Sequence, residues 1–183
     1  MKKIIPLFFL SAIISINSHA QKFYTKNGLI SFYSKATLED IKADNNEVLS
    51  VINIATGDIQ FSLLNTGFHF KKETMEEHFN EDYMESDKYP KSTFKGKIIN
   101  LSEINFTKDG TYNTTVGGDL LIHGVSNKVN ATGTIIIKDG IISATSKFKI
   151  QLADYKITIP GVVQNHIAET IEITVSCNYS NKM

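Results

Sequence analysis

The side chains of this chain that are best suited to chemistry are its histidines and its single cysteine. Four histidines lie beyond residue 20: His69, His78, His123 and His166. None of them is spaced from another histidine, a cysteine or a carboxylate in the pattern of a metal site. Glu77 and His78 are adjacent within a charged segment, which indicates a solvated surface. The sequence therefore predicts no metal site and no cofactor.

Covalent catalysis is also poorly supported by the residue pattern. The chain has no Gly-x-Ser-x-Gly segment, and Gly117-Gly118-Asp119 lacks the lysine and the helix of a phosphate-binding loop. Carboxylate pairs such as Glu39-Asp40 and Glu81-Asp82 lie in polar stretches, where burial that would shift a pKa is not expected. The pattern favours a protein that is not an enzyme, although residues from distant strands could still meet in space.

Cys177 is expected inside a β-sheet and not at a reactive surface. It lies in the segment from Thr170 to Tyr179, where polar and apolar residues alternate without exception. Successive strand residues face opposite sides of a sheet, so this alternation predicts a strand with one buried and one solvated face, typical of antiparallel sheets. Cys177 falls on the apolar side, which favours a small core residue over a nucleophile.

The first twenty residues have the layout of a secretory signal peptide. Lys2 and Lys3 precede an apolar run from Ile4 to Ile16, and Ser18-His19-Ala20 has small residues where signal peptidase cleaves. We expect cleavage after Ala20 and a periplasmic or secreted mature chain, residues 21–183, without a transmembrane segment. This mature chain has 163 residues, enough for one domain, and a formal net charge of −2. It has no basic stripe that would predict binding to nucleic acid.

Turn residues divide the mature chain into short strands. Asp-Gly turns at Lys108-Asp109-Gly110 and Lys138-Asp139-Gly140 are the strongest hairpin signals, with weaker turns at Asn27-Gly28, Asp44-Asn45-Asn46 and Thr56-Gly57-Asp58. The expected strands are residues 21–26, 28–36, 47–55, 58–64, 92–101, 111–122, 128–137, 141–152 and 167–179. Eight or nine antiparallel strands in one domain predict an all-β barrel or sandwich.

The segment from Lys71 to Glu85 breaks the strand pattern and predicts one short helix. Three apolar residues recur there at near-helical spacing: Met75, Phe79 and Met84. Thr74 followed by Glu77 matches a capping box at the start of a helix. Such a helix would pack over the sheet or across a barrel mouth, and its apolar residues would either fix it there or line the entrance of a lipid site.

Several short motifs, in their order along the chain, are similar to those of the YceI-like family. They are Lys88-Tyr89-Pro90, Phe94-Lys95-Gly96, Gly118-Asp119-Leu120-Leu121-Ile122-His123-Gly124-Val125, Phe148 and Asp154-Tyr155-Lys156-Ile157-Thr158-Ile159-Pro160, with Ile167-Ala168-Glu169 before the last strand. The resemblance covers nearly the whole mature chain. It implies an extended, lipocalin-like antiparallel β-barrel of about eight strands, periplasmic or secreted. It also implies a binding protein that holds a long isoprenoid or similar amphiphilic lipid in its lumen.

One segment departs from the pattern of that family. Many relatives carry an Arg-Asp-x-His stretch in the helical region, whereas this chain has Thr-Met-Glu-Glu-His-Phe-Asn from Thr74 to Asn80. If this region meets the head group of a lipid, Glu76, Glu77 and Asp82 would disfavour a pyrophosphate, because anions need donors or cations. We therefore hypothesise a neutral or weakly polar lipid.

Candidate ligand contacts follow from the apolar faces of the expected strands. The candidate lumen lining is Phe94, Val116, Leu120, Ile135, Phe148, Ile171, Ile173 and Val175. The candidate mouth or lid residues are Met75, Phe79, Met84 and His123. Ordinary core packing is the competing interpretation of the lining, and a histidine that ties a turn together is the competing interpretation of His123.

Three hypotheses about function follow from the sequence. The first is a lipid-binding barrel, the second is a secreted structural or interaction module whose barrel is filled by side chains, and the third is a lipid-modifying enzyme. A cavity too small for a lipid tail would favour the second, and a desolvated acid or base in the lumen would favour the third. Apolar residues on the expected outer faces are candidates for a homodimer contact: Leu49, Val51, Leu64, Ile99 and Ile136.

Overall fold

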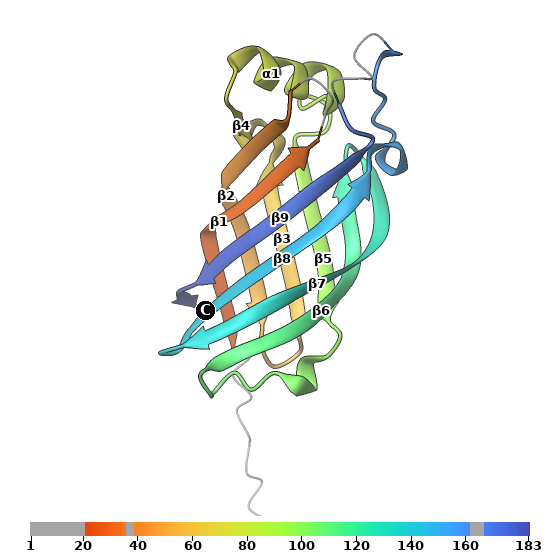
Figure 1. Cartoon of the computed structure of the whole chain (residues 1–183). Helices are drawn as coiled ribbons and strands as arrows, with labels where there is room; N and C mark the ends of the chain where they lie inside the picture. Colours follow the sequence, from red (N-terminus) through yellow and green to blue (C-terminus); the bar gives the residue numbers. More distant parts are fainter. Residues whose placement is uncertain (1–20, 36–38, 162–166) are drawn as a thin grey trace, which may run out of the picture.

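Eight antiparallel strands close into a barrel in the computed structural model of the chain, which describes residues 21–35, 39–161 and 167–183 (Figure 1). The barrel strands are β1 (Lys22–Ser34), β2 (Ile41–Asn53), β3 (Asp58–Leu64), β5 (Lys91–Ile98), β6 (Gly110–Ile122), β7 (Val125–Lys138), β8 (Ile141–Gln151) and β9 (Thr170–Tyr179). Each strand pairs with the next barrel strand along the chain, and β9 returns to pair with β1. The prediction of an antiparallel barrel is confirmed. The expected signal peptide, residues 1–20, and His166 lie outside the described residues.

Short elements decorate the ends of the barrel. They are η1 (Asn65–Gly67), β4 (His69–Phe70), α1 (Glu73–His78), the π-helical η2 (Phe79–Tyr83), η3 (Leu101–Glu103), η4 (Leu152–Tyr155) and β10 (Asn181–Lys182). α1 lies over one end of the barrel (Figure 1). The predicted helix is therefore present but shorter than residues 71–85. The capping box is wrong, because the residue before the first turn is Lys72 and no side chain caps the helix.

None of the helices in the described ranges is both long and apolar enough to cross a membrane.

Two predicted turns are instead parts of long strands. β1 runs through Asn27-Gly28 with shifts of register on either side of Gly28. Gly28 is required by close approach, since a Cβ there would lie 2.7 Å from Sγ of Cys177. β2 includes Asp44-Asn45-Asn46, and the buried Asn45 uses its side chain to donate to the Leu64 carbonyl oxygen and to accept from the Glu47 amide. These side-chain bonds explain why polar residues occur inside a strand.

Of the other three predicted turns, two connect consecutive strands and one is part of a longer loop. Lys138-Asp139-Gly140 does connect β7 to β8, with left-handed φ values of 51° at Asp139 and 75° at Gly140. Thr56-Gly57-Asp58 connects β2 to β3 as predicted. Lys108-Asp109-Gly110 is not a two-residue hairpin, because residues 99–109, including η3, join β5 to β6.

The end of the barrel opposite α1 is filled by side chains. A buried cluster there comprises Ile52, Ile59, Ile98, Ile104, Ile135, Ile137, Ile142, Cys177 and Tyr179. The Tyr179 hydroxyl lies 2.7 Å from Oγ of Ser50, which also donates to the Gln60 carbonyl oxygen. Because both side chains are fully buried, this bonding lets polar groups sit inside an apolar plug. The barrel is thus a cup closed at one end.

Candidate functional site

An apolar cavity of about 380 Å³ occupies the barrel above this plug. All eight barrel strands, α1 and η2 contribute to its wall. Its volume lies within the range of about 300–1,000 Å³ that is typical of small-molecule pockets. The lumen therefore has room for a ligand, which argues against a barrel filled by side chains.

The eight candidate lining residues all lie on the wall of this cavity: Phe94, Val116, Leu120, Ile135, Phe148, Ile171, Ile173 and Val175. They come from five strands whose alternation places the same parity of residues inside. The structure therefore brings them together around one space. That they contact a ligand stays a prediction.

Four phenylalanines form a cluster on the wall near α1: Phe32, Phe68, Phe70 and Phe79. Phe79 was a mouth candidate, whereas the other three were not predicted. The centroids of the four rings lie 5.1–5.6 Å apart in five pairings. Phe79 comes from η2, so its contacts fix the helical segment to the barrel. The alternation of Ile30, Phe32 and Ser34 in β1 could have indicated Phe32, whereas β4 is too short to give a pattern.

Of the other mouth candidates, Met75 and Met84 line the cavity and His123 does not. Nδ1 of His123 donates to the Tyr155 carbonyl oxygen at 3.1 Å, and Nε2 lies 2.7 Å from Oε2 of Glu85. The ring also meets Tyr89 edge-on, with centroids 4.7 Å apart. His123 therefore connects the β6–β7 turn to the segment after η2 and to η4.

The Glu85–His123 contact predicts a pH-dependent contribution to stability. The hydrogen bond from His123 lowers the pKa of the Glu85 carboxyl. A lowered pKa in the folded state gives stability that is present above the unfolded value and is lost as the pH falls through the folded value. We expect Glu85→Gln to lower the Tm at pH 6, and the difference from wild type to shrink as the pH falls below about 4.

Thermal unfolding followed by circular dichroism from pH 7 to pH 3 would measure this difference. Glu77→Gln is a matched control, because no hydrogen bond to the exposed Glu77 carboxylate is formed by the described residues. A Glu85→Gln difference that stays constant down to pH 3 would contradict the assignment.

The cavity wall offers few polar groups, and most of these are already bonded within the protein. Ser34 accepts from the Ala168 amide, Ser92 donates to Asn65, and Ser146 donates to the Thr132 carbonyl oxygen. No Asp, Glu or Lys lines the cavity along the described ranges. A ligand inside would therefore be held by apolar contact.

Metal-binding residues do not gather either. Within residues 21–35, 39–161 and 167–183, no three His, Cys, Asp or Glu side chains lie close enough together to hold a metal ion.

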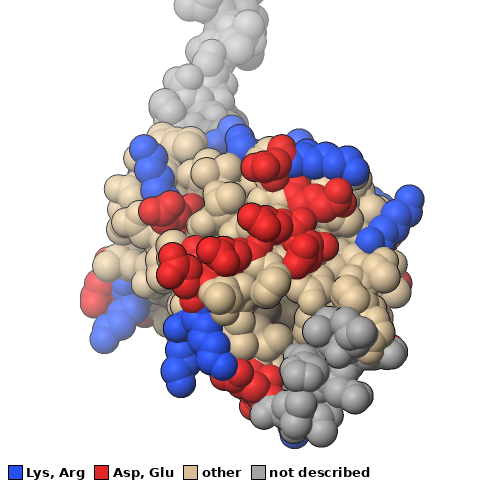
Figure 2. Space-filling model, turned by 90° about the horizontal axis from the view of Figure 1, so that it is seen from above, with Lys and Arg blue, Asp and Glu red and all other residues tan. Residues whose placement is uncertain are grey.

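Acidic side chains gather on the end of the barrel that carries α1 (Figure 2). α1 and η2 contribute Glu73, Glu76, Glu77, Glu81 and Asp82. Near them, Nζ of Lys72 forms an ion pair with Oε2 of Glu39 at 2.5 Å. The surface around the lid is therefore unfavourable for an anionic group.

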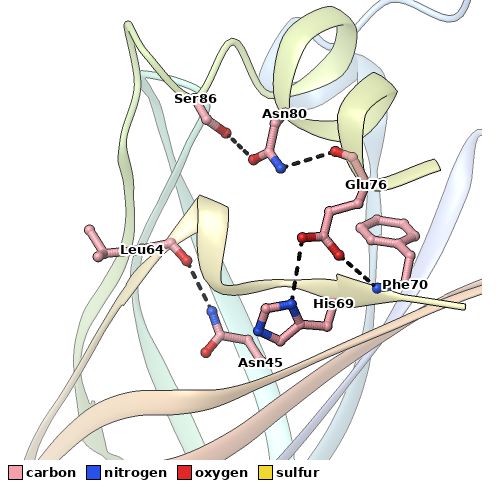
Figure 3. A network of polar contacts seen from close by, with 7 residues as sticks. All are labelled: Asn45, Leu64, His69, Phe70, Glu76, Asn80 and Ser86. Carbon is pink, nitrogen blue, oxygen red and sulfur yellow. Dashed lines mark hydrogen bonds and ion pairs between the residues drawn. The ribbon is translucent and has the colours of Figure 1, made fainter. Parts of the chain in front are cut away.

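Not all of these carboxylates face outward, however. Oε2 of Glu76 accepts from the Phe70 amide at 3.2 Å, and its Oε1 lies 3.5 Å from Nδ1 of His69 (Figure 3). The Glu76 carbonyl oxygen accepts from Asn80, whose own oxygen accepts from Ser86. Glu76 thus fastens α1 to β4, and the hypothesis that it meets a head group needs correction. Asp82 is paired with His78 at 2.8 Å, so Glu77 is the one acid of the three without a partner among the described residues.

Cys177 is predicted to be chemically inert in the folded protein. It is 1% exposed, and burial raises the pKa of its thiol to about 12. Since the thiolate is the reactive form, we expect no reaction with Ellman's reagent at pH 8 under native conditions and one equivalent after unfolding in guanidinium chloride. Rapid stoichiometric labelling of the native protein would contradict this placement.

Comparison with known proteins supports the same fold. A sequence model described as the YceI-like domain matches residues 15–179. A polyisoprenoid-binding domain from Saccharophagus degradans, implicated in plant cell wall breakdown, has a TM-score of 0.75 at 15% identity, covering 87% of this chain and 97% of that one. BcnA of Burkholderia cenocepacia has a TM-score of 0.69 at 15% identity, covering 84% and 96%.

The YceI protein of Campylobacter jejuni has a TM-score of 0.56 at 20% identity, with coverage of 80% and 90%. No curated protein matches the sequence. Because the match to the domain spans most of the sequence, and the barrel has the same architecture as these structures, the chain belongs to the YceI-like family.

Proposed function

We propose that this chain is a periplasmic or secreted binding protein that holds a long-chain isoprenoid or another amphiphilic lipid in its barrel. The observation that carries the proposal is the cavity of about 380 Å³, closed at one end and walled by apolar side chains. The similarity to a domain described as polyisoprenoid-binding supports it. The described wall has no Asp, Glu or Lys, and its one histidine, His78, is paired with Asp82, which favours binding over catalysis.

Burial of the tail would supply most of the affinity. Each methylene-sized unit moved from water into an apolar site contributes about 0.8 kcal/mol, so ten units would contribute about 8 kcal/mol before the losses of association. The eight candidate lining residues would provide this contact, and Met75, Phe79 and Met84 would cover the tail at the α1 end. Specificity would come from the length of the cavity and from the groups at its rim.

The head group is proposed to be neutral or weakly polar. The chain contains no arginine, the residue that best makes paired bonds to phosphate. Glu77 and the neighbouring carboxylates of η2 would repel a pyrophosphate. A hydroxyl or carbonyl head group needs no such cation.

A comparison of head groups on one tail tests this proposal. Binding of a polyprenol, its monophosphate and its pyrophosphate, all of equal chain length, would be measured by displacement of a fluorescent apolar probe. We expect the polyprenol to bind at least tenfold more tightly than the pyrophosphate. Glu77→Lys should raise the affinity for the monophosphate and the pyrophosphate and leave the affinity for the polyprenol unchanged. Tighter binding of the pyrophosphate by the wild type would overturn the head-group assignment, and failure of all three to bind would overturn the proposed function.

Export and association remain predictions. Mass measurement of the exported protein would test cleavage after Ala20. Leu49, Leu64, Ile99 and Ile136 are exposed on the described surface, whereas Val51 is half-buried. A homodimer through these residues would be tested by sedimentation.

A further inference from the structure

The wall of the barrel is incompletely hydrogen-bonded between β7 and β8. Their pairing joins Gly133–Lys138 to Ile141–Ser146 and ends there. Beyond this point β7 is still paired with β6 and β8 is still paired with β9, but β7 and β8 are not paired with each other. We call the unpaired interval between Val125–Thr132 and Lys147–Gln151 the seam. In a closed barrel the strand edges are normally paired, so this interval must be closed in another way.

The cavity reaches the wall at the point where the seam begins. Four residues line both the inner cavity and an outer groove of about 600 Å³: Thr114, Gly133, Thr145 and Ser146. The rest of the groove is mostly hydroxyl and amide side chains from β6, β7, β8 and β9. One layer of chain therefore separates the lumen from the outside here.

Further along the seam, η4 and the residues after it close the wall. Leu152 and Ile157 line the cavity from this position, and Tyr155 is 1% exposed. Figure 1 shows η4 at the end of β8, beside the β6–β7 hairpin. This segment fills the seam with side chains where a strand ladder would otherwise run.

Two side chains, one on β7 and one in the β6–β7 turn, hold η4 in place. Asn127 donates to the Asp154 carbonyl oxygen at 2.7 Å, and His123 donates to the Tyr155 carbonyl oxygen at 3.1 Å. On its other side, the Leu152 amide donates to the Glu169 carbonyl oxygen. The buried Tyr155 hydroxyl has no partner among the described residues. Two side-chain bonds and one unsatisfied hydroxyl make this closure weaker than a strand ladder.

The α1 end of the cavity is, by contrast, covered by packed groups. Phe79 of η2 packs against Phe32, Phe68 and Phe70, and Glu76 fastens α1 to β4. An apolar chain that entered from this end would have to separate the rings and pass the acidic surface.

We propose that the seam is a second, lateral entrance to the lumen, which η4 closes and through which the apolar chain of a lipid passes. Displacement of η4 would open Leu152 and Ile157 away from β7 and join the lumen to the outer groove. The chain would then enter the lumen sideways, past the hydroxyl groups of the groove. This inference rests on the proposed function.

Disulfide locks test the entrance. In Asn127→Cys/Asp154→Cys, a disulfide would link β7 to η4. In Thr132→Cys/Lys147→Cys, a disulfide would link β7 to β8 at the first unpaired position of the seam. Thr134→Cys/Thr145→Cys is the matched control, because these residues are already paired on the same two strands. The buried Cys177 would not interfere, since its thiol pKa is about 12. Uptake of pyrene-dodecanol, a neutral long-chain probe, would be followed by stopped-flow fluorescence before and after reduction.

We expect oxidation to slow uptake at least tenfold in either lock, with recovery on reduction, and to leave the control unchanged. Equal rates of probe uptake by the oxidised and reduced locks would contradict a lateral entrance. If the wild type takes up no probe, the proposed function fails. Hydrogen exchange of the backbone amides then tests separately whether η4 opens. The amides of Leu152–Ile157 should exchange at least tenfold faster than those of Ile141–Ser146, and more slowly in the oxidised lock. Protection equal to that of Ile141–Ser146 would overturn the entrance.

Discussion

Ala131→Trp is expected to weaken binding of a long-chain lipid about 100-fold while the barrel stays folded. Ala131 lies on β7 with its side chain on the cavity wall. If the indole displaces about four methylene-sized units of the ligand, the lost burial is about 3 kcal/mol, which corresponds to about 100-fold in Kd. Titration with a fluorescent long-chain alcohol would measure the change.

Asn130→Trp provides the control for that substitution. Asn130 is the preceding residue of β7, is exposed, and faces outward. The same side chain on the outer face should leave the affinity unchanged. An equal loss of binding in both variants, or no loss in Ala131→Trp, would contradict a luminal ligand.

Gly118→Val is expected to cause the largest loss of stability. Gly118 on β6 pairs with Gly96 on β5, and the Phe94 ring lies over both. A Cβ at Gly118 would lie 2.5 Å from Cα of Gly96 and would collide with the Lys95 carbonyl oxygen. Because backbone atoms cannot move aside as a flexible side chain can, we expect a loss of about 3 kcal/mol or more in the free energy of unfolding.

A loss of that size corresponds to a fall in Tm of about 6–12 °C for a domain of this length. Differential scanning calorimetry would measure it, with Gly161→Val as the matched control. A Cβ at Gly161 meets no atom of the described residues within 4 Å, so the same substitution should change the Tm little. A Gly118→Val protein as stable as the control would contradict the close backbone packing of the Gly96–Gly118 pair.

Alternation of residue types was sufficient to predict the barrel where the strands are regular. β6, β7, β8 and β9 keep one parity inside, with Thr145 of β8 as the exception, so their lining residues could be chosen from the sequence. Phe94 and Phe148 were found in the same way. The physical reason is that a two-residue period leaves little freedom once one face is buried.

The features that escaped prediction depend on contacts between distant segments. Gly28 was assigned to a turn, whereas a glycine is needed there because Cys177, about 150 residues away in the sequence, packs closely against it. Asn45 looked like a turn residue because its bond to Leu64 is equally invisible in the sequence. Glu76 was placed beside a possible lipid head group, yet its carboxylate accepts a hydrogen bond from the Phe70 amide. The seam was not predictable, because where two strands stop pairing depends on their relative twist and not on either pattern alone.

Native mass spectrometry of the exported protein tests the central claim most directly. The protein would be purified without detergent from cells that secrete it, alongside Ala131→Trp. The proposal predicts a one-to-one complex with a neutral long-chain lipid in the wild type, released on unfolding and depleted in Ala131→Trp. A spectrum with the mass of the protein alone, identical in both and unchanged when a polyprenol is added, would contradict it.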